Sequence, residues 1–184
     1  MYNKSGHRLA EHQVPQYQSN HTWSYDWNHH YYYCNNQPMN SYSTNMKGTS
    51  RIQDYGGKPF VLNITEATKQ NNNYRTALWT GKHLQVTLMS IPVGGDIGLE
   101  VHPTTDQFLR IEQGQGLVQM GNRRENLDFQ VMAYDDYAIM VPAGTWHNIT
   151  NTGNLPLKLY AIYAPPEHPF GTVEATKCIA QDME

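Results

Sequence analysis

Between residues 58 and 165, short apolar-rich runs alternate with turn residues, and this alternation constrains the fold more than any other sequence feature. The turns recur roughly every eight to twelve residues and contain glycine, asparagine or aspartate, which adopt the backbone conformations that hairpins need. Such a succession is typical of a β-sandwich or a β-barrel. We therefore predict an all-β fold, with one brief helix capped near Thr65. The runs that we predict as strands are 58–64, 82–91, 98–103, 107–114, 116–121, 127–133, 137–144, 147–153 and 157–165.

The first 57 residues differ in composition from the rest of the chain. Residues 1–57 contain five of the nine histidines and eight of the thirteen tyrosines, but few aliphatic residues. Such a segment buries too little apolar surface to offset the entropy cost of ordering, so we predict a disordered extension. Its role is either adhesive, through stacked aromatic rings or weak metal capture, or it has no separate role. We predict that residues 58–175 form the folded domain and that residues 176–184 form a C-terminal tail.

Glu100 and His102 are two residues apart on a predicted strand that ends at Pro103. Side chains at positions i and i+2 of a strand point to the same face, so the carboxylate and the imidazole are expected to point to one place. Gln107 begins the next predicted strand and can return to the same place.

The spacing around these residues resembles the two sequence motifs of the cupin superfamily, G-x5-H-x-H-x3,4-E-x6-G and G-x5-P-x-G-x2-H-x3-N. Both spacings are met, although the first histidine is replaced by glutamate, the glutamate by glutamine, and the first glycine of the second motif by aspartate. The resemblance covers roughly residues 80–165 and implies a double-stranded β-helix, or jelly-roll, barrel. The matching positions are Gly94, Glu100, His102, Gln107 and Gly114 in the first motif, and Asp136, Pro142, Gly144, His147 and Asn151 in the second.

The resemblance implies that one divalent metal ion is bound by Glu100, His102, Gln107 and His147. All four side chains carry groups that can ligate a metal. Because Glu100 is the single formal anion among them, the site would stay net positive and act as a Lewis acid. The residues leave zinc, manganese and iron open as the metal. The alternative is a buried, hydrogen-bonded polar cluster without a metal.

Other residues are candidates for lining a substrate pocket. Gln85 and Met89 share one face of the predicted strand 82–91. Arg75 could hold an anion at the rim, and Trp79 could offer a stacking face. Tyr160 and Tyr163 lie on the last predicted strand, and one of the two could donate a proton; Tyr160 is the candidate for the pocket lining. A structural role is the alternative for each: an ion pair for Arg75 and core packing for the aromatic residues. The pattern identifies no general base.

Three functions are compatible with this interpretation. The first is a metal-dependent enzyme acting on a small hydroxy-carbonyl or sugar-like substrate, because the mixed ligand set resembles that of zinc-type phosphomannose isomerases. The second is an iron or manganese dioxygenase or decarboxylase. The third is a non-catalytic metal- or ligand-binding protein that residues 1–57 attach to the surface of a spore or cell.

The composition of the chain indicates which classes of binding partner to expect. The formal net charge of −3 is too small to favour nucleic acid or an anionic membrane. The start of the chain lacks the apolar region of a secretory signal, so we expect a cytoplasmic protein, with spore or surface association as the alternative. The resemblance to small cupins, which commonly pair through sheet edges, also implies a homodimer, and a free sheet edge is a liability that pairing removes.

Overall fold

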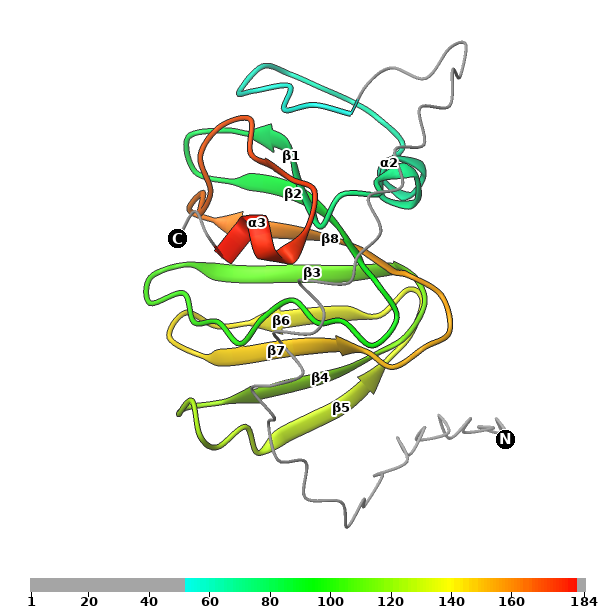
Figure 1. Cartoon of the computed structure of the whole chain (residues 1–184). Helices are drawn as coiled ribbons and strands as arrows, with labels where there is room; N and C mark the ends of the chain where they lie inside the picture. The colour runs from blue at the N-terminus through cyan, green and yellow to red at the C-terminus, as the bar shows by residue number, and fades with distance from the viewer. Residues whose placement is uncertain (1–51, 182–184) are drawn as a thin grey trace, which may run out of the picture.

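Two antiparallel sheets form the body of the protein in a computed structural model that describes residues 52–181 (Figure 1). The larger sheet has six strands in the order β6-β3-β8-β2-β1-β9, and the smaller has three in the order β5-β4-β7. The strands are β1 (Arg75–Thr80), β2 (Gln85–Ile91), β3 (Asp106–Gln113), β4 (Gly116–Gly121), β5 (Phe129–Ala133), β6 (Ala138–Val141), β7 (Trp146–Asn151), β8 (Leu157–Ala164) and β9 (Val173–Glu174), and the helices are α2 (Ile64–Gln70) and α3 (Lys177–Gln181). This arrangement is the predicted all-β jelly roll.

The main core fills the space between the two sheets. Alternate residues of each strand point inward, as the pleat requires. On β8, for example, Leu157, Leu159, Ala161 and Tyr163 are all fully buried. The smaller sheet contributes Val118 and its neighbours from the other side. The inner face of the larger sheet is apolar toward one end of the strands, while its other end carries buried polar side chains.

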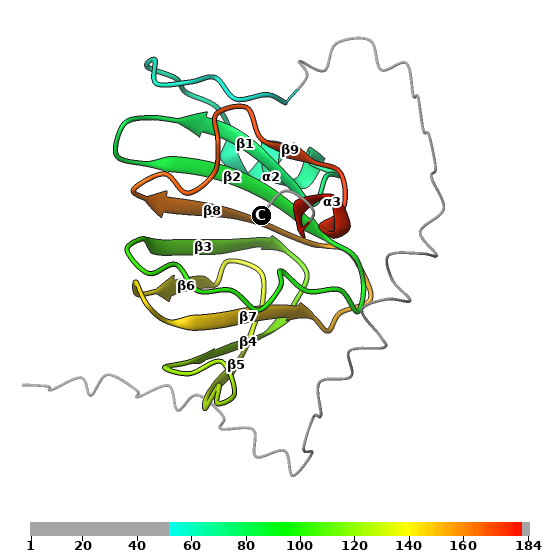
Figure 2. The same cartoon turned by 60° about the vertical axis from the view of Figure 1, so that its left-hand side comes forward.

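A second, smaller core lies on the outer face of the larger sheet. Helix α2 packs Ala67 there against Leu78 and Leu88, and Figure 2 shows the helix behind β1 and β2. The helix begins at Ile64, and the side chain of Asn63 accepts a hydrogen bond from the amide of Glu66 at 3.2 Å. This is an ordinary N-cap. The predicted helix is therefore confirmed, with its cap at Asn63 rather than near Thr65.

Two predicted strands are wrong. Residues 58–63 have irregular backbone leading into α2. Residues 98–103 belong to the long connection between β2 and β3, which runs beside β7 and touches it through the isolated bridge between Glu100 and His147 (Figure 1). Conversely, β1 forms where the sequence analysis placed no strand. Its pairing with β2 contains an irregularity between Ala77 and Trp79.

Residues outside the predicted domain boundaries also pack on the barrel. Ile52 and Tyr55 contact the second core. At the other end, α3 falls in the expected tail, yet Ala180 is buried in the main core. The rest of the predicted N-terminal extension, residues 1–51, lies outside the described residues. Within residues 52–181, no helix is both long and apolar enough to span a membrane.

Candidate metal centre

Glu100, His102 and His147 come together at the polar end of the barrel, with potential ligand atoms all within 4.8 Å of one another. Two backbone hydrogen bonds fix this arrangement. The amide of Glu100 donates to the carbonyl of His147 at 3.1 Å, and the amide of His147 donates to the carbonyl of Glu100 at 2.9 Å. A third, from Gly144 to the carbonyl of His102 at 2.8 Å, holds His102 in place. The β2–β3 connection is therefore tied to β7 at the site.

The two imidazole rings point their Nε2 atoms at the same oxygen. Glu100 Oε1 lies 3.3 Å from His147 Nε2 and 3.5 Å from His102 Nε2. His147 is 1% exposed and His102 is 8% exposed. Neither Nε2 atom has a well-formed hydrogen bond to any residue in the described part of the chain. A buried polar atom without a partner is costly, so the position between these rings favours a ligand that accepts both lone pairs.

The outer nitrogen of each imidazole has a partner that fixes the ring. His147 Nδ1 lies 3.0 Å from the carbonyl oxygen of Thr145, to which it donates. His102 Nδ1 lies 3.2 Å from Glu167 Oε1, and Thr105 donates a 2.8 Å hydrogen bond to the other oxygen of Glu167. A proton held on Nδ1 leaves a lone pair on Nε2, which is the arrangement found for metal-ligating histidines.

Gln107 extends this polar region along β3. It is paired with Tyr163 of β8, and the Tyr163 ring meets the His102 ring edge-on with centroids 5.5 Å apart. Gln107 is 3% exposed, and both of its amide atoms are buried without a hydrogen-bond partner among residues 52–181. The same holds for the hydroxyl groups of Tyr163 and Thr87. The interior at this end therefore offers several unpaired donors and acceptors.

The carboxyl group of Glu100 is ionised. Burial by itself would raise its pKa, but the nearby imidazoles of His102 and His147 and the positive charge of Arg75 hold the pKa well below its usual range. Arg75 Nη2 lies 3.9 Å from Glu100 Oε2, on the side of the carboxylate away from the histidines. One oxygen of Glu100 thus faces the imidazoles, and the other faces the guanidinium.

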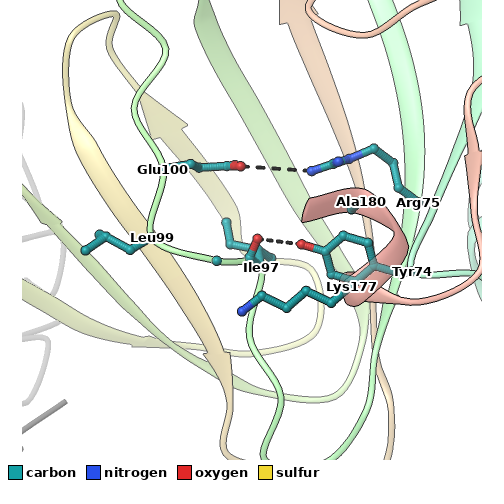
Figure 3. A pocket seen from close by; sticks show the side chains of 8 residues that line it. Tyr74, Arg75, Ile97, Leu99, Glu100, Lys177 and Ala180 are labelled. Carbon is teal, nitrogen blue, oxygen red and sulfur yellow. Dashed lines mark hydrogen bonds and ion pairs between the residues drawn. The ribbon is translucent and has the colours of Figure 1, made fainter. Parts of the chain in front are cut away.

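A small pocket of about 70 Å3 opens beside Glu100 (Figure 3). It lies between the start of β1, the β2–β3 connection and helix α3. In the close-up, the Glu100 carboxylate and the Arg75 guanidinium point toward each other across its upper side. The residues that line it are Tyr74, Arg75, Ile97, Gly98, Leu99, Glu100, Lys177 and Ala180.

Of the residues predicted to line a pocket, Arg75 does so, and Met89 is buried in the main core at the position paired with Arg75. Gln85 is fully buried, and its amide nitrogen donates to the carbonyl of His168 at 2.8 Å. The indole nitrogen of Trp79 donates to the carbonyl of Lys58 at 2.9 Å, so its contact is with the segment before α2.

Tyr160 faces away from the site, which corrects the prediction that it lines the pocket. It packs against the second core on the outer face of the sheet, and its ring lies 6.2 Å from that of Phe108. Inward-facing residues of β8 alternate with outward-facing ones. The tyrosine of β8 that faces the site is therefore Tyr163, three positions later along the strand.

Sequence reasoning missed Glu167 and assigned no role to the neighbouring His168. The amide of His168 donates to Gln85 Oε1 at 2.9 Å, and its ring meets Tyr163 edge-on with centroids 5.0 Å apart. Burial lowers the pKa of His168 to about 3, so its ring is neutral. Both residues lie in the loop after β8, outside the motif spacings, and only the folded chain brings them to the site.

Chemically, the cluster combines one buried carboxylate with two imidazoles whose Nε2 atoms converge on it. These donors suit a divalent transition metal ion, and both Nε2 atoms are buried without a hydrogen-bond partner among residues 52–181. The residues present therefore fit such an ion.

Comparison with known proteins supports the fold and identifies relatives. A model of the cupin domain matches residues 87–163. The uncharacterized protein YrkC of Bacillus subtilis is 70% identical over 133 residues, which cover 72% of this chain and 72% of YrkC. The uncharacterized protein L612 of Acanthamoeba polyphaga mimivirus is 40% identical over 119 residues, covering 64% of this chain and 72% of L612.

Solved structures with similar folds support the assignment to the cupin fold. The crystal structure of BH2720 from Bacillus halodurans is 66% identical in sequence and superposes with a TM-score of 0.71, covering 71% of this chain and 99% of that one. A Klebsiella pneumoniae protein with a double-stranded β-helix domain, 16% identical, superposes with a TM-score of 0.50 and covers 65% of this chain and all of that one. The second likeness concerns the fold alone.

Proposed function

The chain belongs to the cupin superfamily, and on that basis we propose that it is a divalent-metal-dependent enzyme acting on a small hydroxy-carbonyl compound. The proposed metal ligands are Glu100, His102, Gln107 and His147. One observation carries the proposal: two buried imidazole nitrogens without hydrogen bonds, among the described residues, converge on one carboxylate oxygen. A purely structural polar cluster would be expected to pair these atoms.

When bound, a divalent ion would supply Lewis-acid polarisation of a carbonyl or hydroxyl oxygen. The protein's own residues set the conditions around it. Glu100 contributes one negative charge and Gln107 none, so the site keeps a net positive charge. Burial raises the pKa of Tyr163, so its hydroxyl stays protonated and can donate a hydrogen bond to a substrate oxygen.

Pocket size supports a small substrate. The space beside Glu100 is about 70 Å3, whereas ligand sites for larger molecules occupy about 300–1,000 Å3. Of the four proposed ligands, this pocket is lined by Glu100 alone, and a substrate held there would be a small hydroxy-carbonyl compound rather than a sugar or mannose 6-phosphate. Proton transfer between adjacent carbons of such a compound, as in an isomerase, needs an electrophile and a positioned donor, and the site offers candidates for both.

Elemental analysis of the purified full-length protein tests the proposal. We expect near-stoichiometric divalent metal in the wild type, loss of metal in His147→Ala, and weakened retention in Gln107→Ala, since an amide is a weak ligand. His83→Ala is the matched control, because His83 is exposed between β1 and β2. It should retain the metal.

The identity of the metal would distinguish the proposed isomerase reaction from the alternative dioxygenase and decarboxylase reactions. Zinc would support isomerase-type Lewis-acid catalysis, whereas iron or manganese would favour oxygen chemistry or decarboxylation. If the wild type contains no metal and takes up none on reconstitution, the proposal is wrong. A non-catalytic ligand-binding or structural barrel would then be the better interpretation.

A further inference from the structure

Arg75 is a guanidinium buried at the wall of the pocket. It is 1% exposed and is the first residue of β1, and its side chain approaches the carboxylate of Glu100. A buried charge of this kind persists only when something compensates it. Glu174 on β9 does so in part, because Arg75 Nη1 donates to Glu174 Oε2 at 2.8 Å. The other two nitrogens of the guanidinium, Nη2 and Nε, have no comparable ion pair among the described residues.

The remaining donors of Arg75 are incompletely used. Nη2 lies 3.9 Å from Glu100 Oε2, which is beyond hydrogen-bond distance. Nε is buried and forms no hydrogen bond within residues 52–181. A guanidinium has five N–H donors in a planar fork that matches a carboxylate, so this edge of Arg75 suits a second anion.

The charge around the pocket also favours an anionic ligand once a metal is bound. Lys177 on α3 lines the pocket and pairs with Asp96 at 2.5 Å. Lys177 and Asp96 carry opposite charges and cancel. The remaining three side chains, Arg75, Glu100 and Glu174, have a net charge of one negative unit. A divalent cation reverses this to one positive charge, which a monoanion would neutralise.

We propose that Arg75 binds the carboxylate of the substrate, and that the substrate class is therefore a small hydroxy or keto acid. The inference rests on the proposed function, because it assigns the substrate of that same site. The pocket of about 70 Å3 has room for about five groups the size of a water molecule. A ligand of this size that is bound by Arg75 also lies beside Glu100, since both residues line the pocket.

Calorimetric titration of the metal-loaded full-length protein tests this with glycolate and its uncharged analogue glycolamide. In the wild type, glycolate should bind more tightly than glycolamide by about tenfold to a hundredfold, as expected for a charge-assisted hydrogen bond. In Arg75→Met the ratio should fall to near one, and Arg75→Lys should keep part of it. Arg123→Met is the matched control, because Arg123 is exposed in the β4–β5 turn, and it should keep the full ratio.

Folding of the variants is controlled separately. Arg75→Met leaves Glu174 buried without its partner, so the double variant Arg75→Met/Glu174→Gln removes both members of the ion pair. Its thermal unfolding and metal content are measured beside the wild type.

The outcomes separate this inference from the proposed function. A metal-loaded wild type that binds glycolate no better than glycolamide, or binds neither, overturns the role of Arg75 and leaves the metal centre standing. A variant lacking Arg75 that keeps its metal and its preference for glycolate does the same. A wild type that binds no metal overturns both.

Discussion

Removing the carboxylate of Glu167 should weaken metal binding although Glu167 is not itself a proposed ligand. The Glu167 side chain is 29% exposed, and its Oε1 lies 3.2 Å from His102 Nδ1. This contact keeps a proton on Nδ1 and fixes the ring, so that Nε2 presents its lone pair toward Glu100. In Glu167→Ala, the His102 ring would be free to rotate and to change tautomer.

The expected magnitude follows from the role of such outer partners. Loss of a carboxylate behind a metal-ligating histidine typically costs about 10–100-fold in metal affinity. This corresponds to about 1.4–2.8 kcal/mol of binding free energy. Glu167→Gln keeps a hydrogen-bond acceptor but loses the charge, so its loss should be smaller. Thr105→Val removes the 2.8 Å hydrogen bond that orients Glu167 and should have the smallest effect.

Metal affinity is measured by competition with a chelator of known affinity, using the full-length protein. Glu125→Ala serves as the control, because Glu125 is exposed in the turn between β4 and β5. Thermal unfolding of the metal-free variants verifies that each still folds. If Glu167→Ala binds the metal as tightly as the wild type does, the assignment of Glu167 as the positioning partner of His102 is wrong.

Two further predictions concern stability. Leu88→Ala should lower the free energy of unfolding by about 2–5 kcal/mol in denaturant titrations, because Leu88 is fully buried in the second core, whereas exposed Leu155→Ala should change it by less than about 0.5 kcal/mol. Burial lowers the pKa of Lys158 in the folded protein from its ordinary value of 10.5. At pH values between the lowered and the ordinary pKa, Lys158 is therefore protonated in the unfolded chain and deprotonated in the folded protein. Lys158 should therefore make stability rise with pH in that range, and Lys158→Met should show a smaller rise in denaturant titrations at several pH values; equal pH dependence in the two proteins would contradict this.

The strands were predictable where turn residues bracket a pleated pattern. The run from Gly116 to Gly121 is such a case, since a turn residue stands at both ends of an alternating segment, and β4 has those limits. Residues 98–103 show where the same reasoning fails. Their alternation is real, but the β2–β3 connection meets β7 through isolated bridges at Asp96 and Glu100, without a continuous ladder. Local pattern does not reveal whether the pairing with a neighbouring strand is continuous.

The residues of the candidate site also fall into two groups, those that the sequence predicts and those that only the structure reveals. The spacing of the cupin motifs predicts Glu100, His102 and His147 as ligands, and the fold brings their potential ligand atoms within 4.8 Å of one another. Glu167 had no such signal, because it follows the last strand and belongs to neither motif. Tyr160 was predicted to line the pocket, whereas Tyr163 faces the site, because the sequence does not show which alternate residues of β8 face inward. Which set faces inward follows from the register of β8 against β2 and β3.

The sequence by itself determined the all-β class, the order of most strands and the donor types at the motif positions. These features are local: they depend on turn residues, on alternation and on spacing along the chain. Only the tertiary structure decided that Arg75 is buried beside Glu100, that Glu167 supports His102, and that α3 closes one side of the pocket. These contacts join residues from 25 positions apart, for Arg75 and Glu100, to 102 positions apart, for Arg75 and Lys177, and they form because sheet register and core packing bring distant segments together.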